Sequence, residues 1–294
     1  MRPVRVSLLV ACFVSVGVHA AGVAQQPVFK VAVDLVRIDA LVTVGGKPVA
    51  GLGPADFEVI DNGVVQVVDM AGPDRRLDVI LAVDVSGSVE GARFNALRDS
   101  VRALLDQLRP GERVALLTFD ADVALRSPMT ERFAAAGRTL DGIQPTGNTS
   151  MNDAVFAALT LARNDVRSLL LVFSDGADNS SWLSGSQVVE AARRADVVVC
   201  PVAVAVSVES GLRSARFLGA LADRTGGRLF HAESMRTLRA SMIEVLTEFR
   251  SRYVIAYTPT GVSRDDGWHK VEVRLKGRRA DIKAKDGYLA HSER

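Results

Sequence analysis

The stretch "LAVDVSGSV" at Leu81–Val89 decides how the rest of this sequence is interpreted. An apolar run stops at Asp84, and two hydroxyl side chains then follow at alternate positions, Ser86 and Ser88. Aspartate and serine after a strand often form turns or cap helices. Capping is therefore the ordinary interpretation of Asp84 and Ser86 taken alone, and another role needs support from elsewhere in the chain.

Residues 77–249 have the rhythm of strands that alternate with helices. Helical spacing of apolar residues runs from Phe94 to Leu108, where Pro110 and Gly111 are expected to end the helix, and again from Met235 to Phe249. Nearly continuous apolar runs are typical of strands covered on both faces, as in parallel sheets. We therefore predict an α/β fold with a doubly wound, mostly parallel sheet. The runs that carry this prediction are "LDVILAVD", "RVALLTF", "SLLLVFSD" and "DVVVCPVAVAV".

The segments on either side, 28–76 and 250–294, are predicted to be β-rich. Alternating apolar and charged residues run from Val271 to Leu275, and "GRR" is expected to turn the chain into a second strand near Ile282. Neither segment is long enough to build a core alone. We expect 250–294 to pack with 28–76 into one smaller β-rich domain beside 77–249.

Residues 1–24 read as a signal peptide, with an apolar run between a basic start and small residues. A cleaved signal predicts export to the periplasm or the exterior, with envelope association as a further option, and no transmembrane segment in the mature chain. Retention of the signal as an anchor is the alternative, and lipidation at Cys12 is weaker still because that residue lies too early.

Cleavage would also change the charge and thiol content. Removing Arg2 and Arg5 lowers the 36 basic residues to 34, equal to the 34 acidic ones, so we expect no nucleic-acid partner. Removing Cys12 leaves Cys200 as the only thiol, which excludes an internal disulfide.

Polar residues follow the predicted strands at three places. Asp84, Ser86 and Ser88 form the first group, Thr149 lies in "PTGNTSMND", and Asp175 follows the third strand in "FSDG". Ligands bind beyond the carboxyl ends of the strands in such sheets, so these groups are expected to converge. Carboxylate and hydroxyl oxygens suit Mg²⁺, Mn²⁺ or Ca²⁺. Two carboxylates balance the charge of a divalent ion but do not fill its coordination shell, so water would occupy some positions. An acidic residue of a partner protein could replace one of these waters.

The groups "DVSGS", "GNT" and "SDG" resemble the metal-ion-dependent adhesion site (MIDAS) of von Willebrand factor type A (VWA) domains, with the resemblance covering about 77–249. It implies a Rossmann-like fold in which Asp84, Ser86, Ser88, Thr149 and Asp175 surround the cation. Asn148 departs from the pattern, because glycine is common there. The flanks "PADFEVIDNG" and "SRYVIAYTP" more loosely resemble exported bacterial VWFA-related proteins of the acidobacterial type.

Three residues near these motifs have two interpretations each. Ser150 and Asp153 have capping-box spacing, which favours a structural role for Asp153 over direct ligation. Glu90 is expected in a first helical turn rather than at the site. Trp182 is a candidate contact at the rim of the site, or a residue packed over the sheet edge.

The sequence favours an exported, non-enzymatic binding or adhesion protein. The first alternative is a structural envelope scaffold with a weak metal site. A metal-dependent hydrolase is disfavoured, because Ser86 stands where a second acid would be needed and no general base is placed. The motifs carry no information on oligomeric state.

Overall fold

The computed structural model describes residues 35–70, 76–163, 165–175, 177–204, 208–263 and 267–290. The predicted signal peptide, 1–24, lies outside the described residues.

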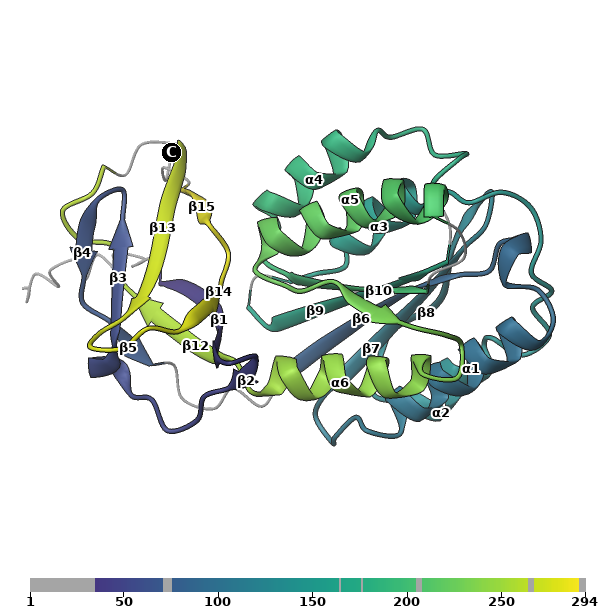
Figure 1. The fold of residues 1–294 in the computed structure, drawn as a ribbon, viewed down its shortest axis with the longest axis horizontal. Coiled ribbons are helices and arrows are strands. Elements are labelled where there is room, and N and C mark those ends of the chain that lie inside the picture. Colours follow the sequence, from purple (N-terminus) through teal and green to yellow (C-terminus); the bar gives the residue numbers. More distant parts are fainter. Residues whose placement is uncertain are drawn as a thin grey trace, which may run out of the picture. The chain divides into compact units, whose positions relative to one another are not determined.

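A six-stranded sheet forms the middle of the α/β domain (Figure 1). Four of its five pairings are parallel, and one edge strand is antiparallel to its neighbour. This confirms the predicted α/β fold with a doubly wound, mostly parallel sheet. The strands, in spatial order, are β11 (Phe230–Ala232), β10 (Val198–Val204), β9 (Arg167–Ser174), β6 (Leu77–Asp84), β7 (Arg113–Phe119) and β8 (Val123–Thr130).

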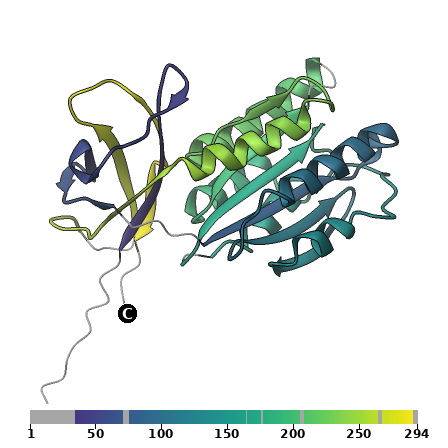
Figure 2. The same ribbon diagram turned by 90° about the horizontal axis from the view of Figure 1, so that it is seen from below.

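Helices cover both faces of this sheet, as Figures 1 and 2 show. Alternate residues of β6 point to opposite faces, so Val79 joins one apolar cluster and Ile80 joins the other. Burial on both faces explains why the central strands are continuous apolar runs. On one side lie α1 (Ala92–Leu105), α2 (Phe133–Arg138) and α6 (Leu238–Arg250), and on the other lie α3 (Met151–Leu159), α4 (Gly185–Arg194) and α5 (Val208–Thr225).

The α1 helix ends earlier than the sequence suggests. It stops at Leu105, and Leu108 continues as a tight turn in which its N–H donates to the Leu105 carbonyl. Pro110 and Gly111 therefore lie beyond the helix end. The apolar spacing persists because Leu108 is still buried against the same core.

Each of the two smaller sheets contains strands from both ends of the chain, and all their pairings are antiparallel. Both contribute to one apolar cluster that includes Ile38, Phe57 and Ile255. Whether these strands fold as a domain of their own stays a prediction. One sheet consists of β14 (Asp281–Lys283), β1 (Val36–Val44), β12 (Tyr253–Tyr257) and β5 (Asp69–Met70), with β2 (Lys47–Pro48) beside β1. The other consists of β15 (Gly287–Ala290), β13 (Gly267–Leu275), β3 (Phe57–Asp61) and β4 (Val64–Gln66).

The strands on either side of "GRR" do not pair with each other as a hairpin. β13 pairs with β3 and β15, whereas β14 pairs with β1 through Val42 and Ile282. Alternation identified both strands, but it sets only which face of a strand is buried. The neighbour of each strand is chosen by packing between distant segments.

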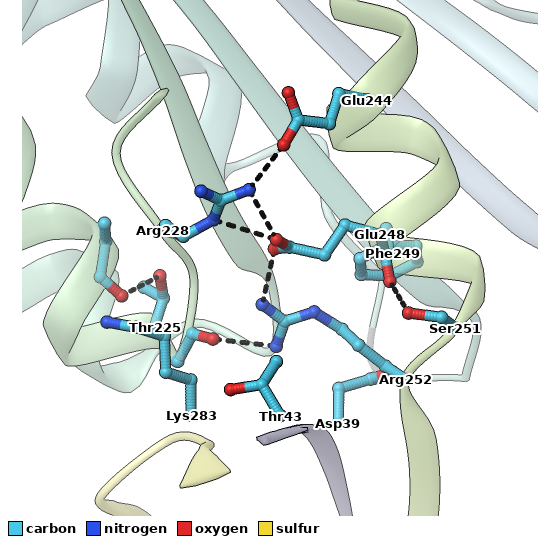
Figure 3. A network of polar contacts seen from close by, with 12 residues as sticks. Asp39, Thr43, Thr225, Arg228, Glu244, Glu248, Phe249, Ser251, Arg252 and Lys283 are labelled. Carbon is cyan, nitrogen blue, oxygen red and sulfur yellow. Dashed lines mark hydrogen bonds and ion pairs between the residues drawn. The ribbon is translucent and has the colours of Figure 1, made fainter. Parts of the chain in front are cut away.

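Charged side chains hold the end of α6 against the rest of the chain (Figure 3). The Glu248 carboxylate accepts from Arg228 Nε at 2.8 Å and lies 3.7 Å from Arg252 Nη2. Arg252 is buried, and its Nη1 donates to the Gly226 carbonyl at 2.7 Å. The connection from α6 into β12 is thereby fixed to the loop that follows α5.

Candidate metal centre

The candidate centre lies where the strand order of the large sheet reverses. β6 has the next strand in sequence, β7, on one side and the later strand β9 on the other. Asp84 is the last residue of β6, and Asp175 directly follows β9. Because Val83 pairs with Phe173, the two carboxylates emerge from adjacent strands. This is the switch point at which doubly wound sheets bind ligands.

Asp84 is fully buried and hydrogen-bonded on both oxygens. Its Oδ1 accepts from the Ser86 N–H at 2.9 Å, and its Oδ2 accepts from Ser174 Oγ at 2.8 Å. Burial raises the pKa of Asp84 to about 6, while the hydrogen bonds from Ser86 and Ser174 act in the opposite direction and Asp175 adds a smaller increase. Burial therefore disfavours the ionised form of Asp84, and a positive charge nearby would stabilise that form.

Asp175 is joined to the same loop through Ser88. Ser88 Oγ donates to Asp175 Oδ1 at 2.5 Å and lies 3.1 Å from Ser86 Oγ. Asp175 Oδ2 is buried and has no hydrogen-bond partner; it lies 3.5 Å from Arg93 Nη1. The structure thus brings Asp84, Ser86, Ser88 and Asp175 together and leaves one carboxylate oxygen without a donor.

The loop that carries Thr149 lies against the Asp84 loop. The Gly87 N–H donates to the Gly147 carbonyl at 3.2 Å. Asn179 holds Thr149 from the other side, accepting from its N–H at 2.7 Å through Oδ1. Gly147 has φ +74°, the backbone region that favours glycine. Asn148, which departs from the expected glycine, is exposed beside it.

The start of α3 is capped from a distant loop and not by Ser150. Ser150 Oγ donates to the Asp120 carbonyl at 2.8 Å, so the predicted capping box is wrong. Asp178 Oδ2 instead accepts from the Asn152 N–H at 2.8 Å. A carboxylate contributed by a different loop leaves no local sequence signal.

Asp153 has a structural role in the same region. Its two oxygens accept from the backbone N–H groups of Trp182, at 2.9 Å, and Leu183, at 3.0 Å. The Trp182 side chain is 96% exposed. The loop that carries it is therefore fixed to the first turn of α3, and packing of Trp182 over the sheet edge is excluded.

Two residues on the α1 side differ from the expectation. Glu90 lies before the helix, because α1 begins at Ala92 after its N-cap Gly91. Arg93, which the sequence did not single out, donates from Nη1 to the Ser88 carbonyl at 3.0 Å. A basic residue in a first helical turn interacts unfavourably with the helix dipole. This unusual position is the only sequence feature that indicates a role for Arg93.

The donors available here fit a hard divalent cation. They are two carboxylates and three hydroxyls, and the buried Asp175 Oδ2 accepts no hydrogen bond. Within the described part of the chain, no group of three or more His, Cys, Asp or Glu side chains could hold a metal ion. Oxygen ligands of low total charge suit Mg²⁺, Mn²⁺ or Ca²⁺ better than they suit a soft metal.

The fold and the site define a Rossmann-like α/β domain with oxygen ligands gathered at its switch point. Residues 79–177 match the family model of the von Willebrand factor type A domain. The chain therefore carries a VWA domain in this region. The narrower resemblance of the flanks to exported bacterial proteins stays a prediction.

Known proteins support this assignment over part of their length. Inter-alpha-trypsin inhibitor heavy chain H2 from Mus musculus is 27% identical over 113 residues, which are 34% of this chain and 12% of that protein. A von Willebrand factor type A structure from Catenulispora acidiphila has a TM-score of 0.54 at 13% identity, covering 85% of this chain and 76% of its own. Proximal thread matrix protein 1 from the mussel byssus, solved with a zinc-occupied MIDAS motif, has a TM-score of 0.51 at 17% identity, covering 61% and 46%. The chain thus spans about a tenth of the mouse relative.

Proposed function

We propose that this protein is an exported, non-enzymatic binding module that captures an acidic side chain of a partner protein through a divalent cation. The cation would be held by Asp84, Ser86, Ser88, Thr149 and Asp175. The observation that carries the proposal is the buried Asp175 Oδ2, which accepts no hydrogen bond although the other oxygen of the same carboxylate accepts one from Ser88.

The small number of charged ligands leaves coordination positions for a partner's carboxylate. Asp84 and Asp175 together neutralise one divalent ion, and Mg²⁺ typically keeps several waters when few carboxylates bind it. Ser88 is exposed, so the site opens to solvent on that side. A carboxylate from a partner could replace one water there. Mg²⁺ is the expected ion, with Mn²⁺ and Ca²⁺ as substitutes; the zinc in the mussel protein's MIDAS shows that the motif accepts other divalent ions in that protein.

Binding fits the site better than hydrolysis does. A general base must lie within hydrogen-bond reach of the group that it activates. Both Asp84 oxygens already accept hydrogen bonds from Ser86 and Ser174, and Ser88 directs its proton to Asp175. These carboxylates are therefore arranged as ligands that hold hydroxyl groups in position.

The proposal of export depends on residues 1–24, and sequencing the N-terminus of the mature protein tests it. The mature protein should begin between residues 21 and 25 in the periplasm or the medium. Among the described helices, none has the length and apolar character needed to cross a bilayer. A chain that retains Met1 and sediments with membranes would support the alternative of an uncleaved anchor.

Partner capture should depend on the cation and on Trp182. We expect wild-type protein to retain envelope proteins in Mg²⁺ that EDTA releases, and Asp84→Ala to retain none of them. Exposed tryptophans on fixed loops are typical of binding hot spots, so Trp182→Ala should weaken capture about tenfold while Mg²⁺ affinity stays unchanged.

This capture experiment separates the two leading interpretations. Asp122→Asn is the matched control, because it removes an exposed carboxylate that is not a proposed ligand. Capture that is equal in EDTA and Mg²⁺ would contradict a cation bridge. A melting temperature that rises with Mg²⁺, with no cation-dependent capture, would favour an envelope scaffold.

Cation binding should weaken as the pH falls through the pKa of Asp84. Because burial raises this pKa to about 6, the contribution of Asp84 to stability is present below about pH 4 and is lost as the pH rises through 6. Binding of a cation requires the ionised carboxylate, so the affinity for the cation increases as the pH rises. The rise in melting temperature caused by Mg²⁺ should therefore be full above about pH 7 and clearly smaller at pH 5. A Mg²⁺ effect of equal size at pH 5 and pH 8, measured by differential scanning fluorimetry, would contradict this.

A further inference from the structure

Arg93 places a guanidinium group beside the candidate metal centre. It lies in the first turn of α1, and its Nη1 is 3.5 Å from Asp175 Oδ2 and 3.0 Å from the Ser88 carbonyl. The Arg93 side chain is 49% exposed, whereas that of Asp175 is 1% exposed. The arginine therefore approaches a buried carboxylate from the solvent side.

The contact concerns the one carboxylate oxygen that hydrogen bonds leave free. Asp84 Oδ1, Asp84 Oδ2 and Asp175 Oδ1 each accept a hydrogen bond. Asp175 Oδ2 accepts none and lies 3.5 Å from Arg93 Nη1. A positive charge in the first turn opposes the helix dipole, so helix stability does not account for Arg93.

We propose that Arg93 is a built-in competitor of the divalent cation. This inference rests on the proposed function of the same site. With no cation bound, Arg93 balances the charge of Asp175. When Asp175 binds a cation, the two positive charges repel each other and the guanidinium of Arg93 moves toward solvent. The protein then binds its cation more weakly than its five oxygen-bearing residues alone would allow, and the cation can exchange readily.

Charge-removing and charge-conserving variants separate this role from simple packing. Arg93→Gln removes the charge, and Arg93→Lys keeps it. Arg102→Gln is the matched control, because Arg102 lies on the same helix and pairs with Asp99 and Asp141. It changes the net charge of the protein by the same amount.

The test is a titration with Mn²⁺, in which electron paramagnetic resonance measures the free ion at pH 7.5 and low ionic strength. Arg93→Gln should bind Mn²⁺ about tenfold more tightly than wild type, as expected for one unit charge a few ångströms from a divalent ion near the surface. Arg93→Lys and Arg102→Gln should stay within about twofold of wild type, and 0.5 M NaCl should reduce the gain of Arg93→Gln because salt screens exposed charges.

The outcomes also separate this inference from the proposed function. If wild type binds Mn²⁺ and Arg93→Gln binds it equally or more weakly, the competition is overturned and the metal site stands. An equal gain in Arg102→Gln would overturn it as well, because the effect would then be one of net charge. If neither wild type nor Arg93→Gln binds Mn²⁺, the metal site itself is overturned, and the competition with it.

Discussion

Asp84→Asn should abolish cation binding and leave the protein at least as stable as wild type when no cation is present. Asparagine has the shape of aspartate, so its Oδ1 can still accept from the Ser86 N–H and Ser174 Oγ can rotate to accept from its amide. At neutral pH it also removes a buried charge whose pKa is raised to about 6 by burial. We expect Mn²⁺ affinity to fall by more than about 100-fold. Removing a residue that only supports a metal ligand typically costs about 10- to 100-fold, and removing the ligand itself should cost more.

Two readouts from one sample check this prediction. Differential scanning fluorimetry without a cation should give a melting temperature equal to or above that of wild type, and 10 mM Mg²⁺ should no longer raise it. Asp122→Asn, which removes an exposed carboxylate, should keep the response to Mg²⁺. If Asp84→Asn still gains stability from Mg²⁺ as wild type does, Asp84 is not part of the cation site.

Gly227→Ala should unfold the protein under conditions that wild type tolerates. A Cβ on Gly227 would lie 1.9 Å from the Val199 carbonyl oxygen and 2.8 Å from its carbon, both in the backbone of β10. The Gly227 N–H is fixed to the Ala222 carbonyl at 2.7 Å, so the loop cannot move away without losing the end of α5. We expect the free energy of unfolding to fall by more than about 3 kcal/mol, as for overpacking against a rigid neighbour.

Gly219→Ala is the matched control for this substitution. Gly219 lies inside α5, and its Cβ would meet nothing within 4 Å. Alanine is favoured over glycine within helices by up to about 1 kcal/mol, so this variant should equal or exceed wild type in stability. Urea unfolding compares the three proteins, and a Gly227→Ala variant within 1 kcal/mol of wild type would contradict the close packing seen here.

The strands that build the site could be predicted because each leaves a local signal. β6 and β7 begin and end at the residues of the runs "LDVILAVD" and "RVALLTF", since burial on both faces makes most positions apolar. β8 left a weaker signal: it is an edge strand, and Leu125 and Arg126 on it are exposed. The pairing of β14 with β1 left none, because it depends on segments more than 200 residues apart.

The same distinction applies to the candidate site. Asp84, Ser86 and Ser88 follow one another in a loop, and the structure joins them to Asp175 as the order of elements predicts. Arg93 and Asp178 were missed because their roles depend on where a side chain reaches in three dimensions. Local patterns therefore identified the candidate ligands, whereas the residues that tune and support them appear only in the folded chain.

The most direct measurement is a crystal structure of the full chain grown with Mn²⁺, with anomalous scattering used to locate the ion. The account predicts one strong peak at the carboxyl ends of β6 and β9, in contact with oxygens of Ser86 and Ser88 and at bonding distance of about 2.0–2.3 Å from its ligands. Asp84→Asn crystals grown in the same way should lack the peak. A peak elsewhere on the protein, or none at the switch point in wild type, would contradict the cation site on which the proposed function depends.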